Sequence, residues 1–335
     1  MFVKVACVAL PILLTVGIIR KYLDYVWGHC KSTESLRGKT FLITGANCGI
    51  GFETAKALVK RNARVIFACR DVEKAKNAIA DIRKEQRTGG EMIIMQVDLS
   101  SLESIKSFAN VVRTGFNKID VLIDNAGVYL PIEQDAKTKD GFEAHFGVNH
   151  LGHFMLTNLL LDLLERAAPS RIVILSSMLH ERGVIDFDDL NMTKLIAAVK
   201  SGDKALIKKT KRMNPGYCNS KLMNVYFGRA LAEKTKGMGI DVFMVCPGFT
   251  YTNLFRQVFK WYNLLLMAPI ILFYMRSAKQ GSQTVLHCAT EKSLEGHTGF
   301  FRNCAPYKSK ITFDKDTEDK LWAVSEKLIA AGKPI

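Results

Sequence analysis

Short apolar runs recur along the chain and are separated by longer amphipathic segments. Each run is shorter than an ordinary helix and ends at or beside a glycine or a polar residue, which favours a buried strand. Strands of a parallel sheet are buried on both faces, so we expect them to be apolar throughout rather than alternating. The runs that fit are Lys39–Gly45, Ala63–Cys69, Glu91–Asp98, Ile119–Gly127, Arg171–Ser177 and Ile240–Gly248.

The segments between these runs have the spacing of helices that pack one face on a sheet. They cover Ile50–Lys60, Asp71–Glu85, about Leu102–Phe116 and a longer region that ends near Glu165. Strands that alternate with helices predict an α/β protein with a single doubly wound parallel sheet, covered on both faces. No repeat of solenoid length interrupts the pattern, so we expect one domain over residues 36–335.

The amino terminus differs from the rest, because Val5–Ile19 contains no charged residue and is followed at once by Arg20 and Lys21. A secretory signal peptide has an apolar region of this length, but no small-residue cleavage site follows this one. With the lysine near its start extending to the membrane surface, the segment just reaches the roughly 20 residues of a spanning helix. We therefore expect an uncleaved amino-terminal membrane-anchor helix over residues 1–21 and a linker over 22–35. Because the cations follow the apolar run, the main domain should face the cytosol.

Composition limits the classes of partner. The chain of 335 residues has a formal net charge of +15, but its lysines and arginines are dispersed and form no nucleic-acid-binding motif. We therefore expect no nucleic-acid partner and interpret most of these cations as solvated side chains. The eight cysteines form no Cys-x-x-Cys pair and no zinc-like spacing with histidine, which argues against a metal site and favours reduced thiols.

A glycine-rich turn, TGANCGIG at Thr44–Gly51, joins the first predicted strand to the first predicted helix. In this position backbone N–H groups and the helix N-terminus can approach a pyrophosphate, so the turn predicts a dinucleotide site. The glycine pattern alone is weak evidence, and its place between a strand and a helix supports it. The residues of the turn that we expect to contact the cofactor are Gly45, Asn47, Gly49, Ile50 and Gly51.

The second and third strands end in residues that would select the cofactor. Arg70 follows the second strand, nineteen residues after Gly51, at the place where an acidic residue would favour NAD. A guanidinium suits the 2′-phosphate of NADP instead, although Asp71 follows directly and an arginine at a helix start needs no ligand. Asp98, at the end of the third strand, is suited to bond the adenine amino group or to cap the next helix.

Tyr217 and Lys221, in the segment GYCNSK, are spaced to lie one helical turn apart on the same face. A free phenol has a pKa of about 10, and a neighbouring ammonium favours its phenolate, so the pair can act as an acid/base and its tuning cation. One face of an ordinary helix is the alternative. Ser177, at the carboxyl end of the fifth strand, is placed to donate a hydrogen bond to a substrate oxygen. No G-x-S-x-G nucleophile elbow is present, which excludes that class of serine hydrolase.

These motifs occur in the order of a known family. The segments TGANCGIG, DNAG (Asp124–Gly127), VNHLG (Val148–Gly152), Ser176–Ser177, YCNSK and PG (Pro247–Gly248) resemble the short-chain dehydrogenases/reductases. The segments ACRDVEKA, NHLGHFMLTNLLLDLL, GSQTVLHCAT and LEGHTGFF are similar to the membrane-anchored, NADP-preferring retinol dehydrogenase branch. The resemblance covers nearly everything after Leu36 and implies a Rossmann fold, oxidoreductase activity and NADP(H) as the cofactor. Two positions depart from the pattern: Asp124 replaces an asparagine and Cys246 a histidine.

The resemblance also assigns roles to single residues. It implies that Tyr217 exchanges the proton, that Lys221 also bonds the nicotinamide ribose, and that Ser177 binds the substrate. Asn149 matches the position that holds a water in the proton relay; the alternative is an asparagine that bends its helix by bonding backbone. We expect His180 to be a loop residue near the substrate mouth. The remaining cofactor contacts implied are Asp98, Asn125, Ala126, Gly127, Pro247, Gly248, Thr250 and Thr252.

The implied reaction is NADP-dependent interconversion of retinol and retinal by hydride transfer, in the direction of retinal reduction. The same chemistry on a steroid, a fatty aldehyde or an isoprenoid, and a non-catalytic NADPH-binding scaffold, are the alternatives. The apolar stretch Trp261–Met275 predicts either a buried lid or a lid that contacts the bilayer. We expect a lipophilic small-molecule substrate and membrane lipid as partners, and leave a homodimer open. The endoplasmic reticulum is the expected membrane, with the mitochondrial membrane or lipid droplets as alternatives.

Overall fold

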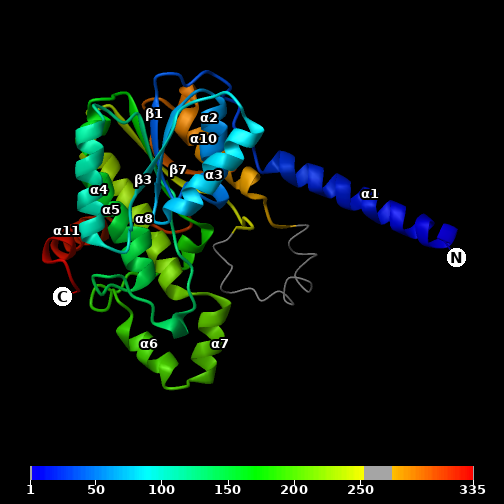
Figure 1. The fold of residues 1–335 in the computed structure, drawn as a ribbon. Coiled ribbons are helices and arrows are strands. Elements are labelled where there is room, and N and C mark those ends of the chain that lie inside the picture. The colour runs from blue at the N-terminus through cyan, green and yellow to red at the C-terminus, as the bar shows by residue number, and fades with distance from the viewer. Residues whose placement is uncertain (1, 253–273, 335) are drawn as a thin grey trace.

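The computed structural model describes residues 2–252 and 274–334 and centres on one eight-stranded sheet (Figure 1). The strands are β1 Thr40–Thr44, β2 Arg64–Cys69, β3 Met92–Gln96, β4 Val121–Asp124, β5 Ser170–Leu175, β6 Ile240–Cys246, β7 Gly299–Arg302 and β8 Ala305–Pro306. They lie in the order β3-β2-β1-β4-β5-β6-β7-β8. Every neighbouring pair is parallel except β7 and β8, which are antiparallel.

The strands form where the apolar runs predicted them. All six predicted strands are present, with ends that differ by one to a few residues, and the doubly wound α/β sheet is confirmed. Every residue of β1 and of β4 is buried, which explains why these runs are apolar throughout. β7 and β8 were not predicted, because strands of four and two residues are too short to show a recognisable pattern of apolar positions.

Helices cover both faces of the sheet. One apolar cluster includes residues of α2 (Gly49–Lys60), α3 (Val72–Glu85) and α10 (Ala278–Thr290); the other includes α4 (Leu102–Gly115), α5 (Gly152–Glu165) and α8 (Pro215–Lys234). Figure 1 shows the two sets on opposite sides of the strands. Successive residues of β1 divide between them, since Phe41 and Ile43 belong to the first cluster and Leu42 to the second. The four helices predicted between the first five strands are confirmed as α2 to α5.

The helix α11 (Lys315–Ala331) packs on α5 and α8. The ring of Trp322 lies 4.8 Å from that of Phe154 and 6.0 Å from that of Phe227, measured between ring centres. α6 (Thr193–Lys200) and α7 (Lys204–Arg212) lie together at a distance from the sheet (Figure 1). The short 3-10 helices are η1 (Ile132–Gln134), η3 (Met178–Arg182) and η5 (Lys292–Leu294), and a π-helical segment η2 (His145–Leu151) leads into α5.

A long helix, α1 (Phe2–Val26), extends away from the body of the molecule (Figure 1). It continues beyond residue 21, where we expected the anchor helix to end. None of the helices in the described part of the chain combines the length and apolar character that a membrane crossing requires. The predicted lid, Trp261–Met275, lies outside the described residues as far as residue 273.

Candidate active site

The carboxyl ends of the central strands bring most of the predicted site residues together. Thr44 ends β1, Asp124 ends β4 and Ser176 directly follows β5. α8 begins beside this edge, because the Lys221 ammonium donates a hydrogen bond to the carbonyl of Leu175, the last residue of β5, at 3.0 Å. Open parallel sheets bind ligands at this edge.

Local sequence places Tyr217 in the first turn of α8. Asn214 is the N-cap residue, and its Oδ1 accepts a hydrogen bond from the Tyr217 N–H at 3.2 Å. Pro215 occupies the first helical position, where its fixed φ suits a helix. Tyr217 is 6% exposed and Lys221 is 4% exposed, so the pair is not part of a solvated helix face.

Burial shifts the pKa values of both side chains, and it raises that of Tyr217, which the neighbouring ammonium was expected to lower. It raises the pKa of Tyr217 well above its ordinary value; the Cys246 thiol acts in the same direction, and a hydrogen bond with the Ser177 side chain acts against it. Burial lowers the pKa of Lys221 from 10.5 to about 8, and Cys246 opposes this decrease. At neutral pH, Tyr217 is therefore a neutral phenol with a proton to donate, and Lys221 still carries its charge.

The two serines after β5 have different surroundings. The Ser176 hydroxyl is buried and donates to the Lys221 carbonyl at 2.7 Å, so it holds α8 against the sheet. Ser177 caps η3, where its Oγ accepts from the Leu179 N–H at 3.2 Å, and its side chain also bonds Tyr217. Of the pair, Ser177 is therefore the one beside the Tyr217 hydroxyl, as the resemblance implies.

Asn149 lies in η2 and is fully buried. Its Oδ1 accepts from the Val128 N–H at 2.8 Å, and its Nδ2 donates to the Val128 carbonyl and the Ser220 hydroxyl, each at 3.1 Å. Its own carbonyl oxygen lies 3.1 Å from Nδ1 of His153, whose Nε2 lies 2.9 Å from the Thr44 hydroxyl. The Asn149 side chain thus bonds backbone, as predicted by the alternative of an asparagine that bends its helix. His153 connects the backbone carbonyl of Asn149 to Thr44 of β1.

The glycine turn exposes backbone where a side chain would not fit. Gly45 and Gly49 have φ values of +67° and +59°, which favour glycine. A Cβ on Gly51 would lie 2.5 Å from both the Gly45 carbonyl oxygen and Asn125 Nδ2. Asn125 Nδ2 in turn donates to the Thr44 carbonyl at 2.8 Å. Since this open turn leads into the N-terminus of α2, its residues fit a dinucleotide pyrophosphate.

The loop after β4 approaches this turn. The Ala126 N–H donates to the Thr44 hydroxyl at 2.9 Å. A Cβ on Gly127 would lie 3.2 Å from Asn149 Oδ1 and 3.8 Å from Lys221 Nζ, so Gly127 lies between two of the predicted catalytic residues. Asn47 lies within the turn itself and Ile50 in the first turn of α2.

The loop after β6 lies close to the same turn. A Cβ on Gly49 would lie 3.4 Å from the Thr252 side chain. The Thr250 hydroxyl lies 3.3 Å from the carbonyl oxygens of both Pro247 and Gly248. These distances bring residues of the glycine turn and of the loop after β6 close together, although they are far apart in sequence.

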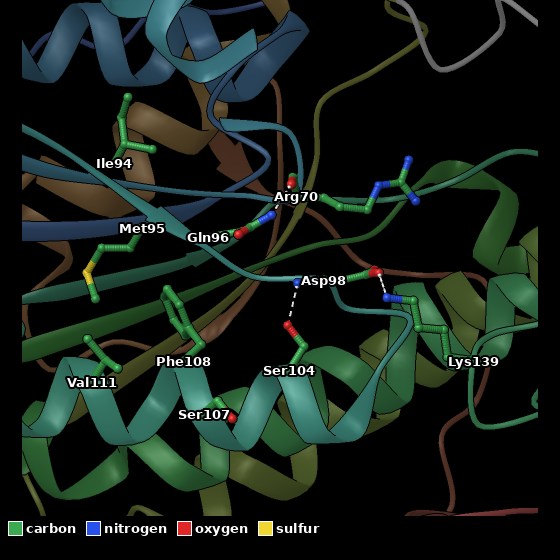
Figure 2. A pocket seen from close by; sticks show the side chains of 10 residues that line it. All are labelled: Arg70, Ile94, Met95, Gln96, Asp98, Ser104, Ser107, Phe108, Val111 and Lys139. Atoms are coloured by element: carbon green, nitrogen blue, oxygen red, sulfur yellow. Dashed lines mark hydrogen bonds and ion pairs between the residues drawn. The ribbon is translucent and has the colours of Figure 1, made fainter. Parts of the chain in front are cut away.

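Arg70 and Asp98 line one groove of about 710 Å³ beside β3 and α4 (Figure 2). Figure 2 shows the Arg70 guanidinium and the Lys139 ammonium at the same end of this groove, and two cations suit a phosphate group. Lys139 was not predicted, because it lies in a loop far from Arg70 in sequence. The other residues that line the groove are Ile94, Met95, Gln96, Ser104, Ser107, Phe108 and Val111.

Asp98 does not cap the following helix, so that alternative is wrong. Ser101 is the N-cap of α4, and its Oγ accepts from the Ser104 N–H at 3.2 Å. The Asp98 carboxylate accepts from the N–H and the hydroxyl of Ser100, at 3.0 and 2.7 Å, and pairs with Lys139 at 3.0 Å. Burial raises the pKa of Asp98, but these bonds outweigh it, so the pKa lies below its ordinary value.

The segment 128–130 packs beside Tyr217, and sequence reasoning missed it. The Asn149 side chain bonds Val128, as described above. His145 Nε2 accepts from the Leu130 N–H at 3.0 Å, and His145 Nδ1 lies 2.5 Å from the buried Glu143 carboxylate. Between these bonds, the ring of Tyr129 lies 4.9 Å from that of Tyr217. The segment therefore presents a fixed aromatic side chain to the predicted acid/base.

His180 lies in η3, whereas we expected a loop residue. It is fully buried, with Nδ1 2.6 Å from the Ser177 carbonyl oxygen and Nε2 2.8 Å from the Ser309 hydroxyl. It therefore ties the turn at Ser177 to a distant loop.

Asp124, one of the two departures from the family pattern, is fully buried. Its Oδ2 accepts from the Thr157 hydroxyl at 2.8 Å, and its Oδ1 has no hydrogen-bond partner among the described residues. Burial raises the pKa of Asp124 to about 7, against the effect of Thr157. At neutral pH this carboxyl is therefore partly protonated.

Comparisons with known proteins identify the family of the chain. The family model for the short chain dehydrogenases matches residues 39–194. Retinol dehydrogenase 12 of Mus musculus is 39% identical over 94% of this chain and 93% of its own length. Retinol dehydrogenase 11 of Homo sapiens is 40% identical over 97% of this chain and 96% of its own length.

Solved structures share the fold. The crystal structure of an uncharacterized protein from Mycobacterium paratuberculosis is 30% identical, with a TM-score of 0.65 over 92% of this chain and 99% of that one. The active-site complex of Pseudomonas aeruginosa RhlG with NADP is 20% identical, with a TM-score of 0.60 over 80% of this chain and 96% of that one. The resemblance to short-chain dehydrogenases, and within them to retinol dehydrogenases, is confirmed.

Proposed function

The chain belongs to the short-chain dehydrogenase family and is an oxidoreductase of alcohols and carbonyl compounds; we propose that it reduces retinal to retinol with NADPH. The observation that carries this proposal is the buried cluster of Tyr217, Ser177 and Lys221 at the carboxyl edge of the sheet. Similar proteins along nearly their whole length are named retinol dehydrogenases, which supports a retinoid substrate.

The roles of the side chains follow from their protonation. Bound NADPH would supply the hydride. Tyr217, a neutral phenol at neutral pH, donates its proton to the substrate oxygen. The Ser177 hydroxyl donates a hydrogen bond to that oxygen as it gains negative charge. The charge of Lys221 stabilises the tyrosinate that remains.

The cofactor contacts are proposed on the fit of the residues described above. The backbone of the glycine turn would hold the pyrophosphate, and the loops that contain Gly127 and Thr252 would adjoin the nicotinamide half. Lys221 would bond the nicotinamide ribose, and the Asn149 region would hold the water of the proton relay. Arg70 and Lys139 at one end of the groove support NADP rather than NAD, because two cations match a 2′-phosphate. Asp98, beside them, would bond the adenine amino group.

We propose the same domain division as before: residues 1–21 as a membrane anchor, 22–35 as a linker and 36–335 as the catalytic domain, facing the cytosol from the endoplasmic reticulum. Exposed apolar side chains on the carboxyl half of α1 support contact with lipid; they include Leu14, Ile18, Ile19 and Tyr22. A topology marker, such as a protease site placed after residue 335, should be cleaved from the cytosolic side of sealed microsomes.

The test is turnover by the purified full-length chain in detergent. All-trans-retinal, a steroid ketone, a fatty aldehyde and an isoprenoid aldehyde are each offered with NADPH and with NADH. We expect retinal with NADPH to give the highest kcat/KM, and Tyr217→Phe to abolish turnover while Tyr25→Phe, at a residue 80% exposed on α1, leaves it unchanged. NADPH binding without consumption of any carbonyl compound would instead support the scaffold alternative.

A further inference from the structure

The base of α1 is bonded to a segment that lies more than two hundred residues later in the chain. Arg20 Nη1 donates to the Met275 carbonyl at 2.8 Å, and Nη2 to Gln280 Oε1 at 3.3 Å. One turn further along α1, Asp24 accepts a hydrogen bond from Gln280 Nε2. The carboxyl end of α1 is therefore fixed to the chain that leads into α10.

The ring of Trp27 contacts two guanidinium groups. The Arg20 guanidinium carbon is 4.9 Å from the centre of its ring, and that of Arg276 is 5.0 Å away. Only 9% of Trp27 is exposed, so both cation–π contacts are largely shielded from water, which strengthens them. The ring thus joins a residue of α1 to a residue of the body.

Arg276 connects this ring to the loop after β6. Its Nη1 donates to the Pro247 carbonyl at 3.2 Å and its Nη2 to Asn303 Oδ1 at 2.5 Å. Its backbone N–H donates to the Phe249 carbonyl at 2.8 Å. Gly248 has a φ of +82°, and a Cβ there would lie 2.5 Å from the Arg276 guanidinium carbon, so the guanidinium packs directly on that loop.

The chain after α1 is packed as closely. Gly28 has a φ of +76°, and a Cβ there would lie 2.3 Å from the Asn303 carbonyl oxygen. Asn303, which also accepts from Arg276, is itself in the left-handed region with a φ of +57°. These contacts over-determine the position of residues 27–28 relative to Arg276, so the ring cannot shift without moving its neighbours.

We propose that Trp27 and Arg276 are positioning residues for the cofactor: they couple the base of α1 to the Pro247–Gly248 loop and hold that loop in the shape that binds NADP(H). The inference rests on the proposed function, because it takes the Pro247–Gly248 loop as part of the NADP(H) site. It adds that α1, beyond its proposed contact with lipid, is a structural part of the cofactor site.

The experiment is a titration of the full-length chain with NADPH in the absence of substrate. Binding is followed by the fluorescence of NADPH. Trp27→Ala removes both cation–π contacts and should raise the Kd for NADPH about tenfold. Trp27→Phe keeps an aromatic ring beside the two guanidinium groups, and its Kd for NADPH should stay within about threefold of that of the wild type. Tyr25→Ala, at an exposed aromatic residue two positions away on α1, is the matched control and should bind as the wild type does.

Steady-state kinetics provide the second readout. In Trp27→Ala we expect the KM for NADPH to rise by the same factor, with kcat at saturating NADPH changed less than about threefold. Arg276→Lys, which keeps a charge near the ring but loses the paired donation to Pro247 and Asn303, should raise the same KM and takes the place of Trp27→Ala if that variant does not fold by circular dichroism.

Wild-type Kd in a folded Trp27→Ala, or an equal loss in Trp27→Phe and Tyr25→Ala, would overturn the coupling. A wild-type chain that binds NADPH but reduces no carbonyl compound would contradict the proposed function and leave the coupling supported if the variants bind as expected. A wild-type chain that does not bind NADPH would overturn both.

Discussion

Replacing Lys221 by methionine should abolish turnover and stabilise the fold. Burial lowers the pKa of Lys221 from 10.5 to about 8, and 1.36 kcal/mol per pKa unit converts this difference into about 3 kcal/mol by which the buried charge destabilises the folded state. Methionine has a similar length and carries no charge. The Leu175 carbonyl keeps a partner in the variant, because Asn224 Nδ2 also donates to it at 3.1 Å.

The pH dependence of this effect identifies its cause. Below about pH 8 the lysine is charged in both the folded and the unfolded chain, so the folded state bears the full cost of about 3 kcal/mol. Between about pH 8 and 10.5 only the unfolded chain keeps the proton, and the cost decreases as the pH rises. The stabilisation of Lys221→Met should therefore be about 3 kcal/mol at pH 7 and about 1 kcal/mol at pH 9.5.

The assay is thermal unfolding of the cofactor-free chain at these two pH values, followed by circular dichroism. For a chain of this size, about 3 kcal/mol corresponds to an increase of about 5 °C in Tm. Lys106→Met, at an exposed lysine of α4, controls for the change in composition and should shift Tm by less than about 1 °C. A Tm for Lys221→Met at or below that of the wild type at pH 7, or a gain of the same size at pH 9.5, would refute the reasoning.

Asp124→Asn should raise Tm more at pH 8 than at pH 4: the folded pKa of about 7 exceeds the ordinary 3.8, so the stability contributed by the protonated carboxyl is lost as the pH rises through that range, by up to about 4 kcal/mol. Ser176→Ala should lower stability by about 1 kcal/mol in urea unfolding and keep turnover, whereas Ser177→Ala should keep stability and lower kcat at least about 100-fold; the reverse pattern would exchange their roles. Arg70→Ser should raise the KM for NADPH about 10- to 100-fold and leave that for NADH unchanged; equal effects on both would contradict 2′-phosphate recognition.

The sequence was sufficient for the parts of the fold that have a regular pattern. The central strands are buried on both faces, so their apolar runs stand out, and the glycine turn is recognisable because its backbone geometry admits only glycine at Gly45 and Gly51. The spacing of Tyr217 and Lys221 likewise indicated one helix face. Each of these features is local, so a short stretch of sequence contains it.

The remaining features depend on contacts between distant residues. The bond from His145 to the segment 128–130 and that from His180 to Ser309 join side chains to partners that no spacing rule connects. Lys139 joins Arg70 only because a loop returns to the edge of the sheet. Asp98 and Ser101 lie three residues apart and are equally good helix caps in sequence. The sequence alone therefore could not show that Ser101 caps α4.

The position of α11 has a consequence for assembly. Leu321, Trp322 and Leu328 are buried against α5 and α8. A second copy of the chain that paired along these two helices would have to displace α11 and expose those side chains, at about 2–3 kcal/mol each. A homodimer would therefore have to use another surface, since pairing along α5 and α8 would lose this burial.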